Sequence, residues 1–276
     1  MSDQPSIRLI VNADDYGYFP HVSRGIMAAA QSGSITATGI MANAADLPSQ
    51  LAELTAVPEL DLGVHLNLTS GCPLTAALRA KLAPWHGQFP GAYRMSLLIM
   101  SGKISLDLVR DEWHAQIQAC QSHRLRFLNS HEHIHMLPVL FPLVLELATA
   151  YRITHVRLTS ADWLWPTSLA GLIRNSLMQF MYLLNRHRLR VSAPLFLGLS
   201  QSGKLDIAYL AKIMSSLHPG QTYELMCHPG YQPEPECIQP RLLAYHAWAT
   251  ELAVLQSRDL AQLYQNHRII LSSYPD

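Results

Sequence analysis

Two adjacent carboxylates follow an apolar run near the start of the sequence. The first half of the stretch from Arg8 to Gly17 is apolar and β-branched, as in a buried strand, and Asp14 and Asp15 come directly after it. Ligands of α/β proteins collect at the carboxyl ends of strands, and two neighbouring negative charges repel each other unless a cation or a proton lies between them. We therefore expect both aspartates at a strand end, beside a bound metal ion.

Three of the 14 histidines stand at alternate positions in the segment His131-Glu132-His133-Ile134-His135. An extended backbone would place these three imidazoles on one face, because alternate side chains of a strand point the same way. A lone histidine is more often a hydrogen-bonded core residue. Three histidines with this spacing, directly after a predicted strand, favour a metal site instead.

The same segment matches the His-Glu-x-x-His pattern, which on a helix supplies two zinc ligands and the general base of a zinc protease. That interpretation needs a helix through the segment. Residues 127–129 are typical of a strand, and Pro138 would interrupt a helix that continued beyond the histidines. We favour the extended interpretation, in which Glu132 points away from the histidine face.

Two further histidines follow predicted strands, His65 near the end of residues 60–68 and His228 after residues 223–227. Together with the paired aspartates and the histidine-rich segment, they place metal-binding side chains at four strand ends, as in the catalytic rim of a barrel. One carboxylate with two histidines leaves positions on an ion open for water and substrate, the condition for metal-assisted hydrolysis. We expect one divalent metal ion, with magnesium or zinc favoured and manganese or iron also compatible with these ligands.

Strands and helices alternate along the sequence, which predicts a parallel sheet. We expect an α/β fold, a single-domain irregular (β/α) barrel of the TIM-like kind with about seven strands, over residues 1–276. Residues 71–93 lack a steady period and predict a long loop, and Trp163 to Pro166 a second, aromatic loop. The predicted strands cover residues 8–13, 35–41, 60–68, 126–129, 155–158, 223–227 and 268–271, and the predicted helices residues 22–31, 46–54, 106–123, 140–151, 169–186, 205–217 and 241–264.

The composition argues against two classes of protein, those that bind nucleic acids and those that span a membrane. The formal net charge is zero at pH 7 and no long basic run occurs, which argues against nucleic-acid binding. No apolar run reaches the roughly 18 residues of a membrane-spanning helix, so we expect no integral membrane segment. The four cysteines, at positions 72, 120, 227 and 237, lack CxxC spacing. The first ten residues do not resemble a signal peptide. A cytoplasmic location is the expectation.

The stretch from Leu169 to Arg190 is apolar and ends in a basic cluster. We favour a core helix whose positive charges lie at its carboxyl end, where they complement the helix dipole. The alternative is peripheral contact with a membrane surface through the apolar face and the basic end.

Four segments of the sequence, in order, resemble the motifs of YdjC-like carbohydrate deacetylases. They are Val-Asn-Ala-Asp-Asp-Tyr-Gly at the start, Gly-Val-His-Leu-Asn-Leu around His65, Asn-Ser-His-Glu-His-Ile-His, and Met-Cys-His-Pro-Gly around His228. The family includes chitooligosaccharide deacetylases and a branch associated with hopanoid biosynthesis. The resemblance runs from Arg8 to the final Ser-Ser-Tyr. It implies a β/α-barrel-like fold, a homodimer, and a divalent-metal hydrolase that removes acetyl groups from N-acetylated sugars.

The resemblance also implies roles for individual residues. Asp15, His65 and His131 would be the metal ligands, and Asp14 the catalytic base that takes a proton from the attacking water. Because an amine leaves poorly unless it is protonated, an acid must face the base. From this chemistry we expect His228 to be the general acid, with His133 as the competitor for that role. Arg157 and Glu224 would either orient the reacting groups or form an ordinary structural ion pair.

Two positions depart from the chitooligosaccharide branch, whose members usually have aspartate where Asn129 stands and histidine where Glu132 stands. Residues 156–158 and 196–203 resemble the hopanoid-associated branch more closely. The expected function is therefore hydrolysis of the acetamide of an N-acetylhexosamine in an oligosaccharide or a glycolipid, with release of acetate.

Two other functions stay open on the sequence alone. Two histidines and one carboxylate also describe the iron site of non-heme oxygenases, which consume oxygen rather than release acetate. A barrel that binds a sugar or a metal without catalysis is the third alternative.

Overall fold

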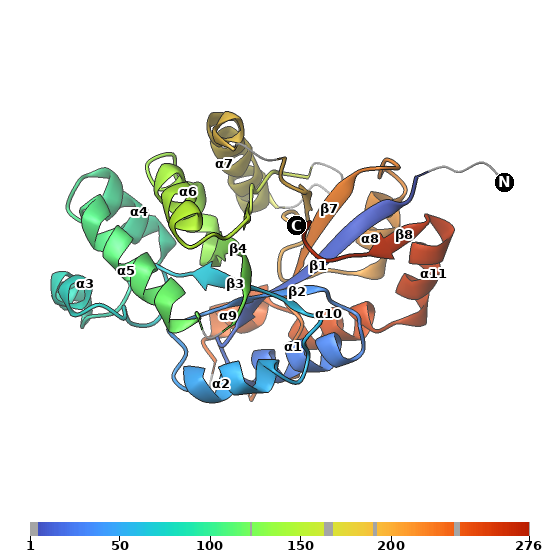
Figure 1. Cartoon of the computed structure of the whole chain (residues 1–276), viewed down its shortest axis with the longest axis horizontal. Coiled ribbons are helices and arrows are strands. Elements are labelled where there is room, and N and C mark those ends of the chain that lie inside the picture. Colours follow the sequence, from blue (N-terminus) through green and yellow to red (C-terminus); the bar gives the residue numbers. More distant parts are fainter. Residues whose placement is uncertain (1–4, 122, 163–167, 190–191, 235–237, 276) are drawn as a thin grey trace.

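The computed structural model describes residues 5–121, 123–162, 168–189, 192–234 and 238–275. Its parallel strands form one curled sheet, an open half-barrel in the order β5-β4-β3-β2-β1-β7-β6, and β8 pairs with β1 (Figure 1). The predicted α/β barrel-like fold is confirmed. The strands are β1 (Ile7–Tyr16), β2 (Ala37–Ile40), β3 (Asp61–Leu66), β4 (Leu125–Ser130), β5 (His155–Val156), β6 (Leu195–Leu197), β7 (Thr222–Cys227) and β8 (Ile269–Leu271).

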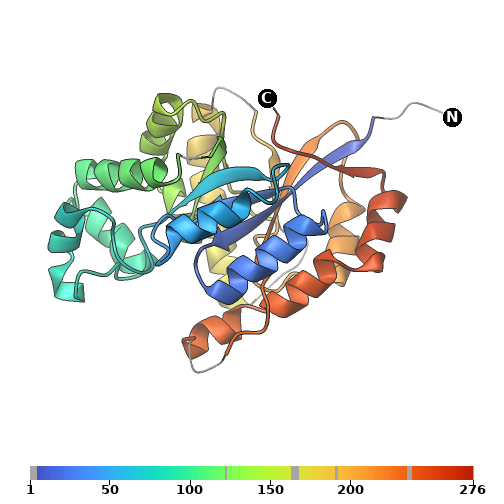
Figure 2. The same ribbon diagram turned by 60° about the horizontal axis from the view of Figure 1, so that its bottom comes forward.

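Helices connect the strands and cover the outer side of the sheet. Figure 2 shows the blue helix α1 along strand β1, with α10 packed against α1 and the red helix α11 beside β8. No helix within the described ranges is both long and apolar enough to span a bilayer. The helices are α1 (Pro20–Gln31), α2 (Leu47–Leu54), α3 (Ala76–Lys81), α4 (Ala92–Met100), α5 (Leu106–Ala119), α6 (Phe141–Ala150), α7 (Leu169–Asn185), α8 (Ile207–Met214), α9 (Pro240–Tyr245), α10 (Trp248–Leu255) and α11 (Arg258–Asn266), with short 3₁₀ segments η1 (Ala83–Trp85), η2 (His131–Met136) and η3 (Arg186–Arg188).

Strand β1 lies at the centre of the sheet, and all but one of its ten residues are buried. One edge pairs with β7 over Arg8 to Ala13. The other edge is shared, with β8 along the first residues and β2 from Asn12 onwards. Burial on both faces explains why Leu9, Ile10 and Val11 are consecutive apolar residues that do not alternate with polar ones.

The segment predicted as a long loop, residues 71–93, instead contains α3, η1 and the start of α4. The prediction was wrong because a distant residue fixes the beginning of α3. Glu112 of α5 is fully buried and accepts hydrogen bonds from the backbone N–H groups of Leu74 and Thr75 and from the Thr75 hydroxyl, at 2.8 to 2.9 Å. No local sequence signal reports such a contact.

The other predicted helices and strands hold with small shifts, except that residues 131–135 form η2 and the helical stretch 241–264 consists of α9, α10 and α11. The short strand β6 and most of helix α4 were not predicted. The aromatic loop expected from Trp163 to Pro166, together with Arg190 and Cys237, lies outside the described residues.

Candidate metal centre

The two aspartates lie at the carboxyl end of β1, as predicted, and only 2% of each is exposed. In a regular strand, neighbouring side chains point to opposite faces. Here the register between β1 and β2 shifts, and Asp15 has a φ of 74°, so the strand bulges at this point. Both carboxylates therefore approach the ring of His65, with Asp14 Oδ1 3.9 Å from Nδ1 and Asp15 Oδ1 3.1 Å from Nε2.

Asp15, His65 and His131 form a compact group of potential metal ligands. One ligand atom from each lies within 4.8 Å of the others, and all three residues are buried. His65 comes from β3, and His131 directly follows β4. The His131 Nδ1 lies 2.7 Å from the same Asp15 oxygen that faces His65. The structure thus brings together the three residues that the sequence resemblance implies as ligands.

The hydrogen bonds around His65 show that this group requires a positive charge. Asn129 donates from Nδ2 to Asp14 Oδ1 at 2.9 Å, which turns its amide oxygen toward His65 Nδ1 at 2.8 Å. Because the amide oxygen can only accept, His65 Nδ1 carries the proton. In neutral His65 the lone pair of Nε2 then faces the Asp15 carboxylate, acceptor against acceptor. A cation between these two atoms resolves the conflict, so the donor set fits a divalent metal ion.

The histidine-rich segment does not have the extended backbone that we expected. It forms the 3₁₀ turn η2, in which Glu132 and His133 adopt left-handed conformations with φ of 51° and 54°. The prediction of three imidazoles on one face is therefore wrong. The zinc-protease interpretation is excluded as well, since it requires an α-helix through these residues.

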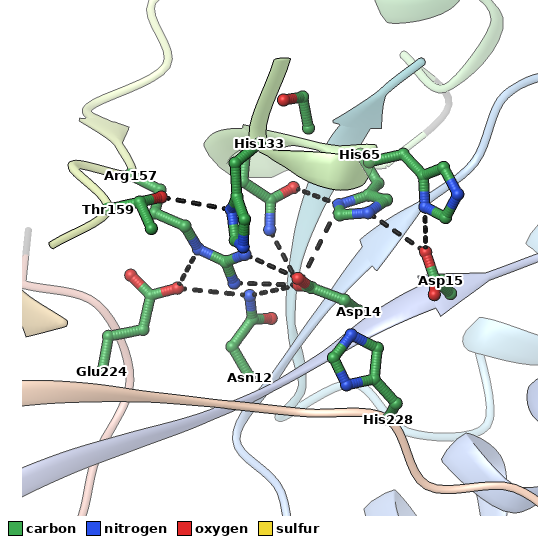
Figure 3. Close-up of polar contacts among 12 residues, drawn as sticks. Asn12, Asp14, Asp15, His65, His133, Arg157, Thr159, Glu224 and His228 are labelled. Carbon is green, nitrogen blue, oxygen red and sulfur yellow. Dashed lines mark hydrogen bonds and ion pairs between the residues drawn. The ribbon is translucent and has the colours of Figure 1, made fainter. Parts of the chain in front are cut away.

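The turn sends its three histidines to three different places. Of the three, His131 alone joins the metal-ligand group. His133 Nδ1 lies 3.2 Å from the Thr159 hydroxyl (Figure 3). His135 is fully buried, donates from Nε2 to the Arg157 carbonyl at 2.9 Å and accepts from the Ser130 hydroxyl at 2.5 Å.

Asp14 lies in a separate network of hydrogen bonds. Arg157, which follows β5, donates to both carboxylate oxygens at 2.6 and 2.8 Å, and its Nε donates to Glu224 of β7 at 2.6 Å (Figure 3). Asn12 Nδ2 lies between the two acids, 3.2 Å from Asp14 and 3.4 Å from Glu224. Arg157 and Glu224 are thus an ion pair that also fixes the orientation of Asp14.

Charged neighbours shift the pKa values of Asp14 and His131 in opposite directions. Burial raises the pKa of Asp14, but the Arg157 charge, and then that of His65, outweighs burial and lowers the pKa to about 2. Burial lowers the pKa of His131, but the Asp15 carboxylate outweighs burial and raises the pKa to about 9. Both acids are therefore ionised at neutral pH, and the ligand group holds a proton where a metal ion would otherwise supply the positive charge.

His228 follows β7 in a loop that packs tightly against α1 and α10. Its backbone N–H donates to the buried Glu251 at 2.5 Å. A Cβ added to Gly25 of α1 would lie 2.3 Å from the Cα of Gly230, so these two glycines allow the close approach. The His228 ring lies 5.2 Å from that of His246, and its Nδ1 has no hydrogen-bond partner among the described residues. Figure 3 shows this ring beside Asp14 and Asp15.

Residues 8–266 match a family model described as YdjC-like protein. The chain belongs to the YdjC-like family. A carbohydrate deacetylase of Homo sapiens is 30% identical to this YdjC-like chain over 252 residues, which cover 84% of the chain and 77% of that relative. A chitooligosaccharide deacetylase of Yersinia pestis (strain Pestoides F) is 35% identical over 149 residues, 51% of the chain and 55% of that relative.

Among solved structures, a candidate cellobiose-phosphate cleavage protein of Enterococcus faecalis V583 has the same fold. The TM-score is 0.72 at 22% sequence identity, and the match covers 97% of each chain. This likeness shows that the two chains share a fold over nearly their whole length.

Some residues that shape the centre of this YdjC-like protein carry no signal in the sequence. A Cβ on Gly39 of β2 would lie 3.0 Å from Asn129 Oδ1 and 3.1 Å from His65 Cβ, so Gly39 leaves room for the hydrogen bond that sets the His65 proton. Asn12 and His246 were also not predicted. Asn12 alone had a sequence signal, because it stands two positions before Asp14 and side chains at that spacing share a strand face.

Proposed function

We propose that this protein is a metal-dependent carbohydrate N-deacetylase, which hydrolyses the acetamide of an N-acetylated sugar and releases acetate. The observation that carries the proposal is the convergence of Asp15, His65 and His131 beside a separate ionised carboxylate, Asp14. A ligand group with an adjacent free base is what hydrolysis of an amide requires. The names of the human and Yersinia pestis relatives support the same reaction class.

Asp15, His65 and His131 would hold one divalent ion, magnesium or zinc. The fixed proton on His65 Nδ1 leaves Nε2 as the ligand atom, and Asp15 supplies a carboxylate oxygen. Such an ion acidifies water and polarises a carbonyl oxygen when it is bound. The protein's part is to fix these three ligands while leaving coordination positions open.

Asp14 would accept the proton of the attacking water. Its pKa of about 2 keeps it ionised across the neutral range, and the Arg157 guanidinium holds both of its oxygens. Glu224 and Asn12 fix the guanidinium and the carboxylate in turn. In this arrangement Arg157 and Glu224 are positioning residues, because they act through Asp14.

His228 would donate the proton that the departing amine needs. Its Nδ1 is not engaged by any described residue, although its backbone is firmly held by Glu251. His133 is the weaker choice, because burial, followed by the charge of Arg157, keeps its pKa well below the ordinary value, so that it is neutral. A neutral imidazole that is hard to protonate is a poor general acid at neutral pH.

The substrate class is taken from the relatives' names, and an N-acetylhexosamine in an oligosaccharide or a glycolipid is the proposed acceptor. One domain over residues 1–276, a cytoplasmic location and a homodimer belong to the same proposal. Sedimentation equilibrium of the purified protein tests the dimer.

The reaction is tested by measuring acetate from a panel of N-acetylated oligosaccharides and glycolipids, with and without chelator and in the absence of oxygen. Chelator-sensitive acetate release without oxygen is the expected result. Turnover that requires oxygen and bound iron would instead identify an oxygenase, and ligand binding without any product would identify a non-catalytic barrel.

A further inference from the structure

Helix α7 exposes large apolar side chains along its whole outer face. Seven of them lie at helical spacing over roughly four turns, and the helix is at the upper edge of the molecule in Figure 1. Isolated apolar residues are common on protein surfaces, but a continuous patch of this size marks an interaction site. The seven residues are Leu169 (75% exposed), Leu172 (39%), Ile173 (59%), Leu177 (52%), Phe180 (58%), Leu183 (47%) and Leu184 (36%).

The inner face of α7 is unusually polar. Asn175 and Asn185 are buried and donate hydrogen bonds to the backbone carbonyls of Asp162, at 3.4 Å, and Met136, at 2.7 Å. A surface helix normally places its apolar stripe inward and its polar residues outward. The inner face of α7 also buries Met178 and Met181, so the helix packs on the core as expected. Its outer face differs from that of an ordinary surface helix, because large apolar side chains lie there.

The charged residues of the chain segment that contains α7 are all basic. The whole chain has 20 acidic and 20 basic residues, yet residues 163–205 contain five lysines and arginines and no acid. Arg186 and Arg188 directly follow the helix, in η3, and Arg174 lies within it. An apolar face next to basic side chains is complementary to a surface that is apolar below and negative above.

Helix α4 repeats this combination. Tyr93, Leu97 and Met100 are 85%, 67% and 66% exposed, and residues 62–106 contain four basic residues and no acid. Both α4 and α7 contact η2, the turn that begins with the metal-ligand candidate His131. The two helices with exposed apolar faces thus flank the same element of the site.

We propose that the outer face of α7, together with that of α4, docks on the surface of a membrane with anionic headgroups. The apolar side chains enter the boundary between headgroups and acyl chains, and the arginines contact the negative headgroups. A second copy of this chain fits the face less well, because a symmetric contact through α7 would bring Arg186 and Arg188 of both copies to one interface without any acid from residues 163–205. The proposal is independent of the deacetylase function.

Co-sedimentation with vesicles tests the proposal, using phosphatidylcholine alone or mixed with phosphatidylglycerol. The wild-type protein is expected to bind the mixed vesicles, and to bind them less at high salt because headgroup attraction is screened. Ile173→Ser with Phe180→Ser removes two side chains more than half exposed and should lower the partition coefficient at least about tenfold. Ile270→Ser is the matched control, since Ile270 is 55% exposed on β8, outside both acid-free stretches, and binding should be unchanged.

The electrostatic part is tested by Arg186→Glu with Arg188→Glu, against Arg24→Glu with Arg258→Glu as a charge-matched control outside both stretches. We expect the first pair alone to lose binding to the mixed vesicles. Circular dichroism and thermal melting establish that each variant is folded.

Three outcomes would overturn the proposal. One is no binding to either kind of vesicle, and the second is equal binding by the wild type and the Ile173→Ser, Phe180→Ser variant. The third is sedimentation equilibrium that shows a wild-type dimer and a monomeric variant, which would make this face an interface between two copies. Acetate release in solution is measured in parallel, so a failure of docking is distinguishable from a failure of the deacetylase proposal.

Discussion

The two halves of the site, one around Asp15 and the other around Asp14, differ in the charge that balances each carboxylate. Asp15 faces two imidazoles, and in the absence of an ion His131 is the group that carries the compensating proton. Asp14 is balanced permanently by the Arg157 guanidinium, which cannot lose its proton. The positive charge is therefore exchangeable on one side and fixed on the other.

Under the proposed function, this difference suits two neighbouring residues to two chemical tasks, metal binding for Asp15 and proton transfer for Asp14. A carboxylate whose partners are imidazoles can give up a proton in exchange for a metal ion, since histidine binds metals in its neutral form. A carboxylate held by an arginine stays ionised and in one orientation, as a base must. The bulge at the end of β1 makes the difference possible, because it turns adjacent side chains into separate environments around one histidine.

The largest effects are expected when Asp15 and Asp14 are each replaced by asparagine, which tests whether the two carboxylates have different tasks. Asp15→Asn should lose the metal ion and reduce acetate release about a thousandfold or more, because a ligand is removed. Asp14→Asn should keep the ion and reduce acetate release about a hundredfold or more, because the base is removed. Metal content and turnover are measured for both, with Asp46→Asn, an exposed aspartate, as control. Equal metal loss in both variants would contradict the division of tasks.

The double variant Arg157→Met, Glu224→Gln removes the guanidinium that balances the charge of Asp14. It replaces both members of the ion pair, so neither is left unpaired. Burial then raises the pKa of Asp14 from about 2, since the guanidinium no longer opposes it. Activity should fall about tenfold at pH 7 and several-fold further at pH 5, where Asp14 becomes partly protonated. A profile of kcat/KM against pH with the wild-type shape would show that Arg157 does not set this pKa.

On the Asp15 side, Gly39→Ala disturbs the hydrogen bond between Asn129 and His65 without replacing any of the three proposed metal ligands. The added methyl group would lie 3.0 Å from Asn129 Oδ1, so it displaces the partner that fixes the His65 proton. We expect metal affinity to fall about tenfold, as for other losses of a group that orients a metal-bound histidine. Titration calorimetry measures the affinity. Gly102→Ala gives the reference for a glycine with open space around it, and a fall of equal size there would contradict the explanation.

The smallest expected effect is a change in folding stability caused by His135. This residue lies in the same turn as His131, but its pKa is lowered whereas that of His131 is raised. Burial lowers the pKa of His135 to about 3, so the folded protein leaves it neutral while the unfolded chain binds a proton below its ordinary value of 6.5. Stability should therefore fall as the pH drops from 6.5 to 5, by about 1.5 kcal/mol from this residue. His135→Gln should be less stable at pH 7 but should have a shallower pH dependence. Urea unfolding at both pH values measures this, and an unchanged slope would rule out the explanation.

The sequence predicted that the aspartates, His65 and His131 lie at strand ends and close together, because strand ends are marked by apolar runs that stop at polar residues. It failed in the turn after β4, where left-handed conformations at Glu132 and His133 replace the expected strand without any glycine to announce them. It also failed to predict α3, whose start depends on Glu112, and Gly39, whose importance lies in the space beside His65. The failures at α3 and Gly39 each involve a contact between residues far apart in the chain.

The central claim is that Asp15, His65 and His131 hold one ion while Asp14 stays outside its ligand set. Anomalous diffraction from crystals grown with zinc or manganese tests it most directly. The account predicts a single strong peak about 2.0 to 2.3 Å from one atom of each of the three residues, with Asp14 still bonded to Arg157. A peak coordinated by Asp14 and Arg157's other partner Glu224, or no peak at this group, would contradict it.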